Sequence, residues 1–248
     1  MTQLLAPAKL TWTLEVLARR ADGLHELRAD MTTISLCDVL DVDESADYLR
    51  VVGPHSAAVS LGPANLVSRA LAQVGRRAGV TLRKEIPVGG GLGGGSADAA
   101  AILRWAGALN PATALELGSD VAFCVVGGHA LVGGVGEVVS PLPFSPTELT
   151  LVMPDFAVST GAVYRAYDEM IAARWRPSGT NHLEEPAARV EPRVARALAW
   201  LRERHGAASL AGSGSTMFVP RIWGDDDAWD DIGPDGVLSF RRVATTPG

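Results

Sequence analysis

The sequence predicts an α+β fold in two domains, and three observations carry this prediction. The N-terminal third alternates polar and apolar residues with the period of two that is typical of β-strands. Near the middle of the chain, a strand-like run, a glycine-rich loop and a helix-forming run follow one another. The second half combines helical stretches with short apolar runs. Pro141 and the stretch from Pro143 to Thr147 separate the halves, so we expect an N-terminal domain over 1–145 and a smaller C-terminal domain over 146–248.

Strands dominate the predicted elements before the glycine loop. They are expected over residues 8–17, 31–42 and 49–53. A turn at residues 21–23 ends the first of them. Asn65 then precedes a run whose apolar residues recur at helical spacing, and it is placed to cap a helix that Gly79 ends.

The elements after this helix alternate between strands and helices. Residues 81–88 alternate like a strand, and strong helix formers over 97–109 predict a helix after the glycine loop. Three apolar runs are expected to be buried and partly in strands, over 120–128, 129–139 and 149–154. Two further helices are expected over 161–175 and 193–206. The acidic stretch 223–236 is expected to be a loop before a short final strand over 237–243.

Composition excludes several classes of protein. With 47% hydrophobic and 20% charged residues in 248, the chain can bury enough apolar surface to fold, and a soluble protein is expected. A net charge of −6 argues against a nucleic-acid binder, so a small molecule is the expected partner. No export signal or membrane-spanning stretch is evident, and Cys37 and Cys124 are expected to be reduced thiols in a cytoplasmic protein. Only two of the 22 basic residues are lysines, Lys9 and Lys84.

The glycine-rich loop is the first strong functional signal. Six of the eight residues from Gly89 to Ser96 are glycine, which is costly in chain entropy unless the backbone turns tightly or approaches a ligand. A helix follows, so the loop presents free N–H groups and the positive end of a helix dipole to an anion. A phosphate site is therefore predicted, with a flexible hairpin or a tight packing contact as the alternative. The loop lacks the Gly-Lys-Ser/Thr ending of a Walker motif, and its match to the dinucleotide pattern G-x-G-x-x-G is weak evidence within a glycine run.

Three motifs resemble those of the GHMP kinases, the galactose, homoserine, mevalonate and phosphomevalonate kinases. Residues 87–100, PVGGGLGGGSADAA, resemble the ATP-binding second motif of that superfamily. Residues 7–10, PAKL, resemble its first motif, and residues 210–216, LAGSGST, resemble its third. The resemblance implies two α+β lobes with ATP and substrate between them, the N-terminal lobe binding ATP.

Within this superfamily, stretches spread over residues 6–219 resemble the family of kinases that act on 4-diphosphocytidyl-2-C-methyl-D-erythritol in non-mevalonate isoprenoid (terpenoid) biosynthesis. This resemblance implies transfer of the ATP γ-phosphate to the 2-hydroxyl of the methylerythritol, with Mg²⁺ accompanying ATP. Asp120 matches the catalytic Asp of these kinases and would accept the hydroxyl proton. Lys9 matches their Lys and would hold that carboxylate and the developing charge.

The resemblance also implies an ATP site around the glycine loop. Its residues are Asn65, Pro87, Val88, Gly89, Gly90, Gly91, Leu92, Gly93, Gly94, Gly95 and Ser96. Ser96 is the candidate Mg²⁺ ligand. Capping of its own helix explains Asn65 equally well, and a capping role for Ser96 is compatible with the Mg²⁺ role. For Asp98, a structural role is at least as well supported as a metal role.

The implied substrate site departs from the family pattern. It comprises Thr11, Leu24, His25, Tyr164, Gly212 and Ser213. In the family an aromatic ring precedes the His and stacks on the cytosine that the His hydrogen-bonds, whereas here Leu24 stands in that place. Thr11 occupies the place of an Asn, and the segment 108–118 and the tail after Val219 are unlike the family.

These departures leave two alternatives to the cytidylated substrate. One is a GHMP-type kinase for another small alcohol, in a pocket that no longer recognises cytosine. The other is a catalytically silent nucleotide-binding homologue that kept the scaffold. In each case a monomer or homodimer is expected.

Overall fold

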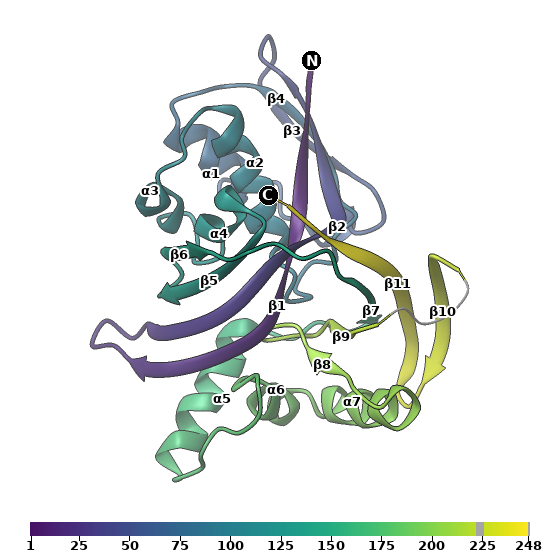
Figure 1. The fold of residues 1–248 in the computed structure, drawn as a ribbon. Coiled ribbons are helices and arrows are strands. Elements are labelled where there is room, and N and C mark those ends of the chain that lie inside the picture. The colour runs from purple at the N-terminus through teal and green to yellow at the C-terminus, as the bar shows by residue number, and fades with distance from the viewer. Residues whose placement is uncertain (222–225, 248) are drawn as a thin grey trace.

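The computed structural model describes residues 1–221 and 226–247, with the side chains of residues 111 and 112 outside that description. Within these residues, eleven strands form one branched sheet. Helices α1–α4 gather beside the N-terminal strands, whereas α5–α7 lie at the opposite end of the molecule, next to the C-terminal strands (Figure 1). The predicted α+β class is confirmed.

Two long strands form the backbone of the sheet. β1 (Thr2–Arg19) and β2 (His25–Asp43) pair antiparallel over their whole length, from Thr2 opposite Val42 to Arg19 opposite His25. Both extend well beyond their predicted ranges, because a tight turn joins them and lets even their polar ends pair. β3 (Tyr48–Val52) agrees with its prediction.

Strand β2 joins the remaining strands together. Besides β1, it pairs antiparallel with β5 (His129–Gly134), β11 (Gly236–Thr246) and β4 (Gly79–Arg83), at successive points along its length. β3 pairs parallel with β4, and β6 (Val138–Pro141) pairs with β5. β11 also pairs with β7 (Glu148–Pro154), so the C-terminal strand ties the two halves of the chain together.

The first helix begins as predicted but ends early. α1 (Leu66–Gln73) is capped by Asn65, whose side chain accepts from the Val67 amide. Gly75 ends the helix with a φ of 65°, so the prediction that Gly79 ends it is wrong. Gly79 instead begins β4.

The helices that follow the glycine loop differ from prediction in two ways. α2 (Gly94–Trp105) starts within the glycine run, three residues before the predicted start. Residues 121–125 are buried as expected, but they lie in helix α4 (Val121–Val126), so their strand prediction is wrong. A short, wholly apolar run has no periodicity that separates a buried helix from a buried strand. α3 (Pro111–Leu115) was not predicted.

The C-terminal half follows the predicted order, with one correction. Its helices are α5 (Thr160–Ala172), α6 (Glu184–Val190) and α7 (Pro192–His205), of which α6 was not predicted. Short strands β8 (Ser209–Leu210) and β9 (Met217–Val219) flank the third motif. The loop predicted over 223–236 is wrong where it is described, because β10 (Ala228–Gly233) pairs with β11 and Trp229 stacks on Phe240. Residues 222–225 lie outside the described residues.

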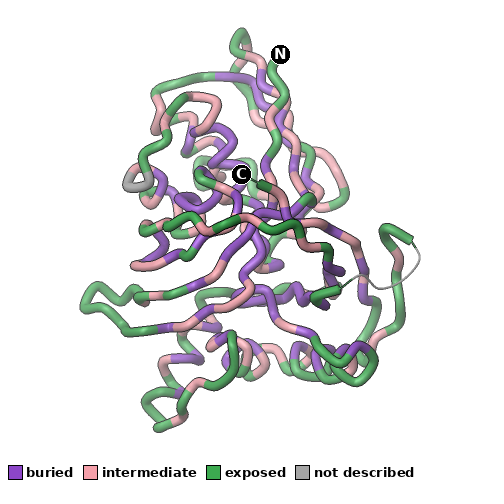
Figure 2. Tube along the Cα trace, viewed as in Figure 1, coloured by how far each residue is buried: buried purple, intermediate pink, exposed green. Residues whose placement is uncertain are grey.

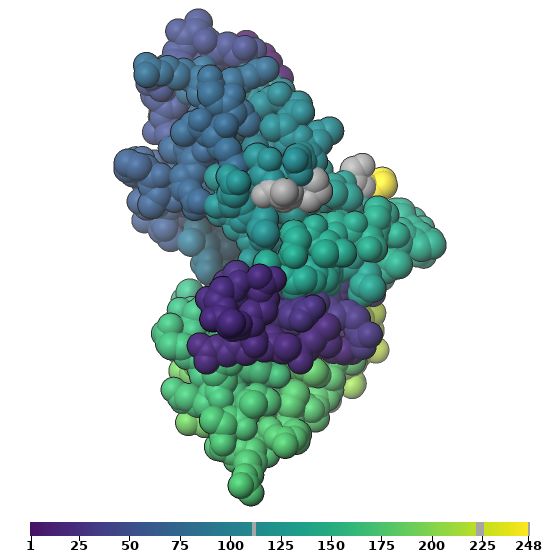
Figure 3. Space-filling view, turned by 90° about the vertical axis from the view of Figure 1, so that its left-hand side faces the viewer, coloured from purple at the N-terminus to yellow at the C-terminus, as the bar shows by residue number. Residues whose placement is uncertain are grey.

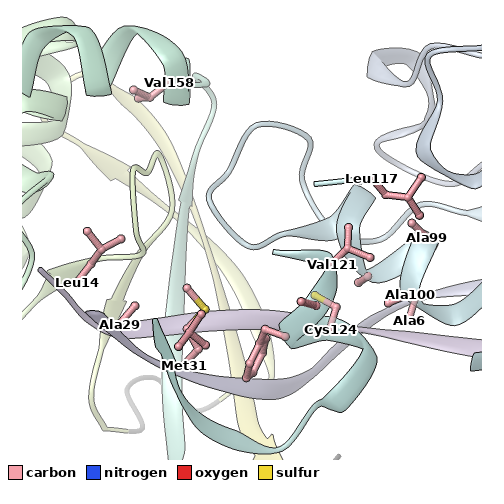
Figure 4. Close-up of a cluster of buried hydrophobic side chains, with 14 of the residues drawn as sticks. Ala6, Leu14, Ala29, Met31, Ala99, Ala100, Leu117, Val121, Cys124 and Val158 are labelled. Atoms are coloured by element: carbon pink, nitrogen blue, oxygen red, sulfur yellow. The ribbon is translucent and has the colours of Figure 1, made fainter. Parts of the chain in front are cut away.

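The core runs through both halves of the molecule. Burial is concentrated where β1 and β2 cross the centre of the molecule and along the inner faces of the helices (Figure 2). One cluster extends from Leu14 and Ala29 of the hairpin, past Met31 and Cys124, to Val121 of α4 and Ala100 of α2 (Figure 4). A second cluster lies behind the glycine loop and includes Ile86 and Leu92, both fully buried. Within the described ranges, none of the helices is long and apolar enough to cross a membrane.

Candidate active site

One cleft of about 760 Å³ brings together residues from both halves of the chain. Its walls come from the β1–β2 hairpin, the glycine loop, the start of α4, α5 and the third-motif loop. The space-filling view shows a recess between the N-terminal body and the hairpin that lies over the C-terminal half (Figure 3). Every site residue predicted from the sequence lines this cleft except Thr11, which is buried beneath it.

Lys9 and Asp120 meet in the cleft, although 111 positions separate them in the sequence. Lys9 Nζ lies 3.6 Å from Asp120 Oδ2, and the Lys9 side chain is buried whereas about a third of the Asp120 side chain, 34%, is exposed. Lys9 Nζ also donates to Thr11 Oγ1 at 3.1 Å, which fixes the position of the ammonium. Asp120 precedes α4, but its side chain accepts no capping hydrogen bond. The carboxylate therefore does not cap the helix and is available to a ligand.

The glycine loop packs tightly against its neighbours. Gly93 adopts a φ of 68°, and a Cβ there would lie 2.8 Å from Lys9 Cγ, so the glycine makes room for the lysine stem. Gly91 adopts a φ of 79° and faces the carbonyl oxygens of Ala211 and Gly214 in the third-motif loop. Leu92 lines the cleft, but its side chain is fully buried and anchors the loop in the core. The Thr216 amide donates to the Gly90 carbonyl at 3.0 Å, so the second and third motifs form one unit.

A buried amide holds the third-motif loop in place. Asn181 Nδ2 donates to the carbonyl oxygens of Leu210 at 3.0 Å and of Gly212 at 2.7 Å. Next to it, His182 Nδ1 accepts from the Val16 amide at 3.1 Å and so ties this segment to the hairpin. Gly212 and Ser213 are thereby held at the edge of the cleft, where Ser213 Oγ lies 2.9 Å from Thr160 Oγ1.

Aromatic and charged side chains form the end of the cleft next to α5. His25 begins β2, and its Nε2 lies 2.7 Å from Asp168 Oδ1. The His25 ring stacks on Tyr164, with centroids 4.7 Å apart. Leu24 is half exposed beside it. Asp168 was not predicted as a site residue, yet it follows Tyr164 by one helical turn, so helical spacing could have placed both side chains on one face.

The opposite end of the cleft is bounded by the segment before α1. Asn65 Nδ2 donates to the Ser60 carbonyl at 2.8 Å, while its Oδ1 caps α1. Asn65 therefore both caps its helix and lines the cleft. Ala58, Val59 and Leu66 line this end and were not predicted from the sequence. For Ser96, the structure places Gly93 at the N-cap of α2, so the Ser96 hydroxyl is not used in capping.

Beneath the glycine loop lies a buried triad of charged residues, Asp38, Lys84 and Asp98. Lys84 Nζ donates to Asp38 Oδ2 and, at 2.8 Å, to Asp98 Oδ2. Burial raises the pKa of the Asp98 carboxyl from 3.8 to about 7; the Lys84 ammonium opposes this shift and the Asp38 carboxylate adds to it. The triad accounts for Lys84, the second of the two lysines.

The raised pKa of Asp98 predicts a pH-dependent difference in stability. Between about pH 4 and pH 7 the native state binds more protons at Asp98 than the unfolded state, so its contribution to the free energy of unfolding falls as pH rises. As pH rises through this window, we expect the free energy of unfolding of Asp98→Asn to increase relative to that of the unsubstituted protein. Urea unfolding of both proteins at a series of pH values measures this, and two parallel pH profiles would contradict it.

Comparison with known proteins places this geometry in a family. The chain matches the family models described as GHMP kinases N terminal domain, over residues 64–128, and GHMP kinases C terminal, over residues 163–220. A crystal structure of 4-(cytidine 5'-diphospho)-2C-methyl-D-erythritol kinase superposes with a TM-score of 0.69 and 32% identity, covering 97% of this chain and 99% of that one. A mevalonate kinase structure superposes with a TM-score of 0.62 at 10% identity, covering 100% of both chains, and shares the fold.

Curated relatives agree with the structural match. The 4-diphosphocytidyl-2-C-methyl-D-erythritol kinase of Paracoccus denitrificans is 37% identical, covering 86% of this chain and 84% of the relative. The kinase of the same name from Pelotomaculum thermopropionicum is 39% identical, covering 86% and 87%. The chain therefore belongs to the 4-diphosphocytidyl-2-C-methyl-D-erythritol kinase family of the GHMP kinases.

Proposed function

We propose that this kinase transfers the γ-phosphate of ATP to the 2-hydroxyl of 4-diphosphocytidyl-2-C-methyl-D-erythritol. The observation that carries the proposal is the Lys9–Asp120 pair, which lies in the same cleft as the glycine loop and the His25 pocket. Phosphoryl transfer needs an oriented hydroxyl, an acceptor for its proton and cations around the migrating charge. The pair supplies the last two, between the two ends of one cleft.

Each residue of the pair has a separate role in the proposed reaction. The Asp120 carboxylate accepts the proton of the 2-hydroxyl. At the same time the hydroxyl oxygen bonds to the γ-phosphorus, and the bond from that phosphorus to the ADP oxygen breaks. The Lys9 ammonium holds the Asp120 carboxylate in place and stabilises the negative charge of the transferring group. Thr11 acts through Lys9, since its hydroxyl holds the ammonium and does not itself line the cleft.

The glycine loop is proposed to bind the ATP phosphates through its backbone amides and the N-terminus of α2. Asn65 and the apolar residues near it would border the nucleotide base. Mg²⁺ is usually held by one or two protein oxygens together with substrate phosphates. The Ser96 hydroxyl lies in the first turn of α2 and does not cap the helix, so it fits such a ligand. When bound, the ion neutralises charge on the β- and γ-phosphates.

The pocket at α5 is proposed to bind the cytidine end of the substrate. The carboxylate of Asp168 can only accept, so it favours a proton on His25 Nε2 and fixes the ring orientation. The Tyr164 ring stacks on one face of the His25 ring and so supports that orientation. Leu24 offers an apolar surface where the family has an aromatic ring, so base binding relies more on His25 and less on stacking.

The proposed function is tested by coupled ADP release from Mg-ATP, with 4-diphosphocytidyl-2-C-methyl-D-erythritol beside mevalonate, homoserine and galactose as acceptors. Turnover with the cytidylated substrate alone is expected. Turnover with another alcohol would keep the mechanism and change the substrate. ATP binding without turnover on any acceptor would favour a silent scaffold.

Substitution of His25 tests the cytidine pocket. His25→Ala removes a hydrogen-bonding ring from the pocket, and we expect the KM for the cytidylated substrate to rise about tenfold while the KM for ATP is unchanged. The matched control is His129→Ala, because His129 pairs with Asp30 at 2.8 Å in the same way but does not line the cleft. An unchanged substrate KM in His25→Ala would remove His25 from the site.

A further inference from the structure

Three charged side chains beneath the glycine loop take no part in the mechanism above. Asp38, Lys84 and Asp98 are 0%, 2% and 3% exposed. Burying such charges is expensive, and replacing a buried ion pair by apolar residues is often neutral or stabilising. The fold therefore gains little stability from the triad, so its position beneath the glycine loop is the feature that calls for an explanation.

The triad contacts the chain on both sides of the loop. Asp38 Oδ1 accepts from the amides of Glu85 at 2.6 Å and Ile86 at 2.9 Å, immediately before Pro87. Asp98 lies in the first turns of α2, two residues after Ser96. Lys84 bridges the two carboxylates, so one network joins the segment that enters the loop to the helix that leaves it.

Lys84 also lies directly under the start of the helix. A Cβ on Gly94 would come 2.8 Å from Lys84 Nζ, so only a glycine allows the ammonium this close to the helix backbone. Lys84 lines the cleft, but it is almost fully buried and its ammonium is already bonded to two carboxylates, so it is not arranged as a phosphate-binding lysine. Asp98 Oδ1, by contrast, is buried without a hydrogen-bond partner among the described residues, which leaves the exit side of the loop dependent on its single bond to Lys84.

We propose that Asp38, Lys84 and Asp98 are positioning residues that hold the two ends of the glycine loop in its phosphate-binding shape and thereby set the affinity for the nucleotide phosphates. The proposal rests on the proposed function only in taking the loop as the phosphate site. A loop that binds through backbone amides depends on their direction, because small displacements of positioned groups weaken binding and catalysis strongly. The triad fixes the direction of the loop amides, because it holds the residues on both sides of the loop.

The test is the affinity of Asp98→Asn for ADP, measured by isothermal titration calorimetry. The substitution keeps the side-chain volume and removes the charge-assisted bond to Lys84. We expect ADP to bind about tenfold more weakly, the KM for ATP to rise to match, and kcat at saturating ATP to stay within about twofold of the unsubstituted enzyme. A second pair, Lys84→Met and its neighbour Arg83→Met, is expected to weaken ADP binding only in the first, since Arg83 is exposed.

Two outcomes of this experiment would overturn the proposal. Unchanged ADP affinity in Asp98→Asn would mean that the triad only supports the fold. A fall in kcat with unchanged affinity would place Asp98 in the chemistry instead. Because ADP binding needs no acceptor, failure of the triad proposal is separate from failure of the substrate assignment, which turnover by the unsubstituted enzyme reports.

A measurement on the unsubstituted protein keeps the proposal testable if both variants fail to fold. Hydrogen exchange of the Glu85 and Ile86 amides without nucleotide should be as slow as that of β2, because Asp38 holds the entrance of the loop before any ligand arrives. Fast exchange of the Glu85 and Ile86 amides, which donate to Asp38, would overturn the proposal.

Discussion

Asp120→Asn is expected to reduce turnover by at least about a thousandfold, because an amide cannot accept the proton of the substrate hydroxyl. ATP binding should change little, since the loop amides, and not Asp120, are proposed to hold the phosphates. The substitution keeps the shape of the side chain. As Asp120 makes no capping bond to α4 and is a third exposed, we expect no large loss of stability.

Three measurements on the same preparation check this expectation. They are kcat with the cytidylated substrate, the dissociation constant of ATP, and the melting temperature. Asp30→Asn is the control, because Asp30 is a partly buried carboxylate paired with His129 away from the cleft. Equal losses of folding and ATP binding in Asp120→Asn would argue against its catalytic role, as would turnover above a tenth of the unsubstituted rate.

The sequence predicted elements well where periodicity was unambiguous. The strands at β1–β3 and β7 and the helices α5 and α7 were found in the right order, because alternation or helical spacing persisted over enough residues. Residues 121–126 were misassigned, since a six-residue apolar run is equally compatible with a buried strand and a buried helix. β10 was missed because its acidic residues suggest a loop, whereas its pairing with β11 is a contact that local sequence does not carry.

Candidate site residues could be named from the sequence where a motif contains them. Lys9, the glycine loop, Asp120 and the third motif come from separate segments, and only their resemblance to one superfamily indicated that they meet. Thr11 was predicted to touch substrate, but it lies two residues after Lys9 on the same face of β1 and is buried with its hydroxyl bonded to the Lys9 ammonium. The Asp38–Lys84–Asp98 triad joins three positions far apart in sequence, so only the fold reveals it.

The length of the β1–β2 hairpin explains how one cleft contains both the proposed phosphoryl-transfer centre and the proposed cytidine pocket. Lys9 lies midway along β1, beside the glycine loop, and its amide donates to the Leu92 carbonyl at 3.0 Å. His25 lies at the far end of the same hairpin, against α5. A shorter strand, as predicted from the sequence, would not carry the proposed base pocket out to α5. The hairpin therefore sets the distance between the proposed phosphoryl-transfer centre and the cytidine pocket.

Gly91→Ala is expected to have the second large effect, a loss of ATP affinity of at least about a hundredfold, which corresponds to about 3 kcal/mol. Two costs combine at this position. The φ of 79° is unfavourable for any residue with a Cβ, by about 1–2 kcal/mol. The new Cβ would also collide with the Ala211 carbonyl oxygen and lie 2.9 Å from that of Gly214, so the glycine loop and the third-motif loop would have to separate.

Gly75→Ala separates these two costs, since Gly75 has a φ of 65° but a Cβ added there would meet no atom within 4 Å, and the residue lies outside the cleft. Gly75→Ala should be less stable by about 1–2 kcal/mol and keep its ATP affinity.

A pair of substitutions at Gly90 and Thr216 tests the contact between the two loops. A Cβ on Gly90 would lie 2.8 Å from Thr216 Oγ1, a buried atom without a partner in the described chain, so removing that hydroxyl should relieve the clash. Gly90→Ala should weaken ATP binding and Gly90→Ala with Thr216→Ala should restore it. Equal ATP affinities in Gly91→Ala and Gly75→Ala, or no rescue at Gly90, would show that contact between the two loops does not control nucleotide binding.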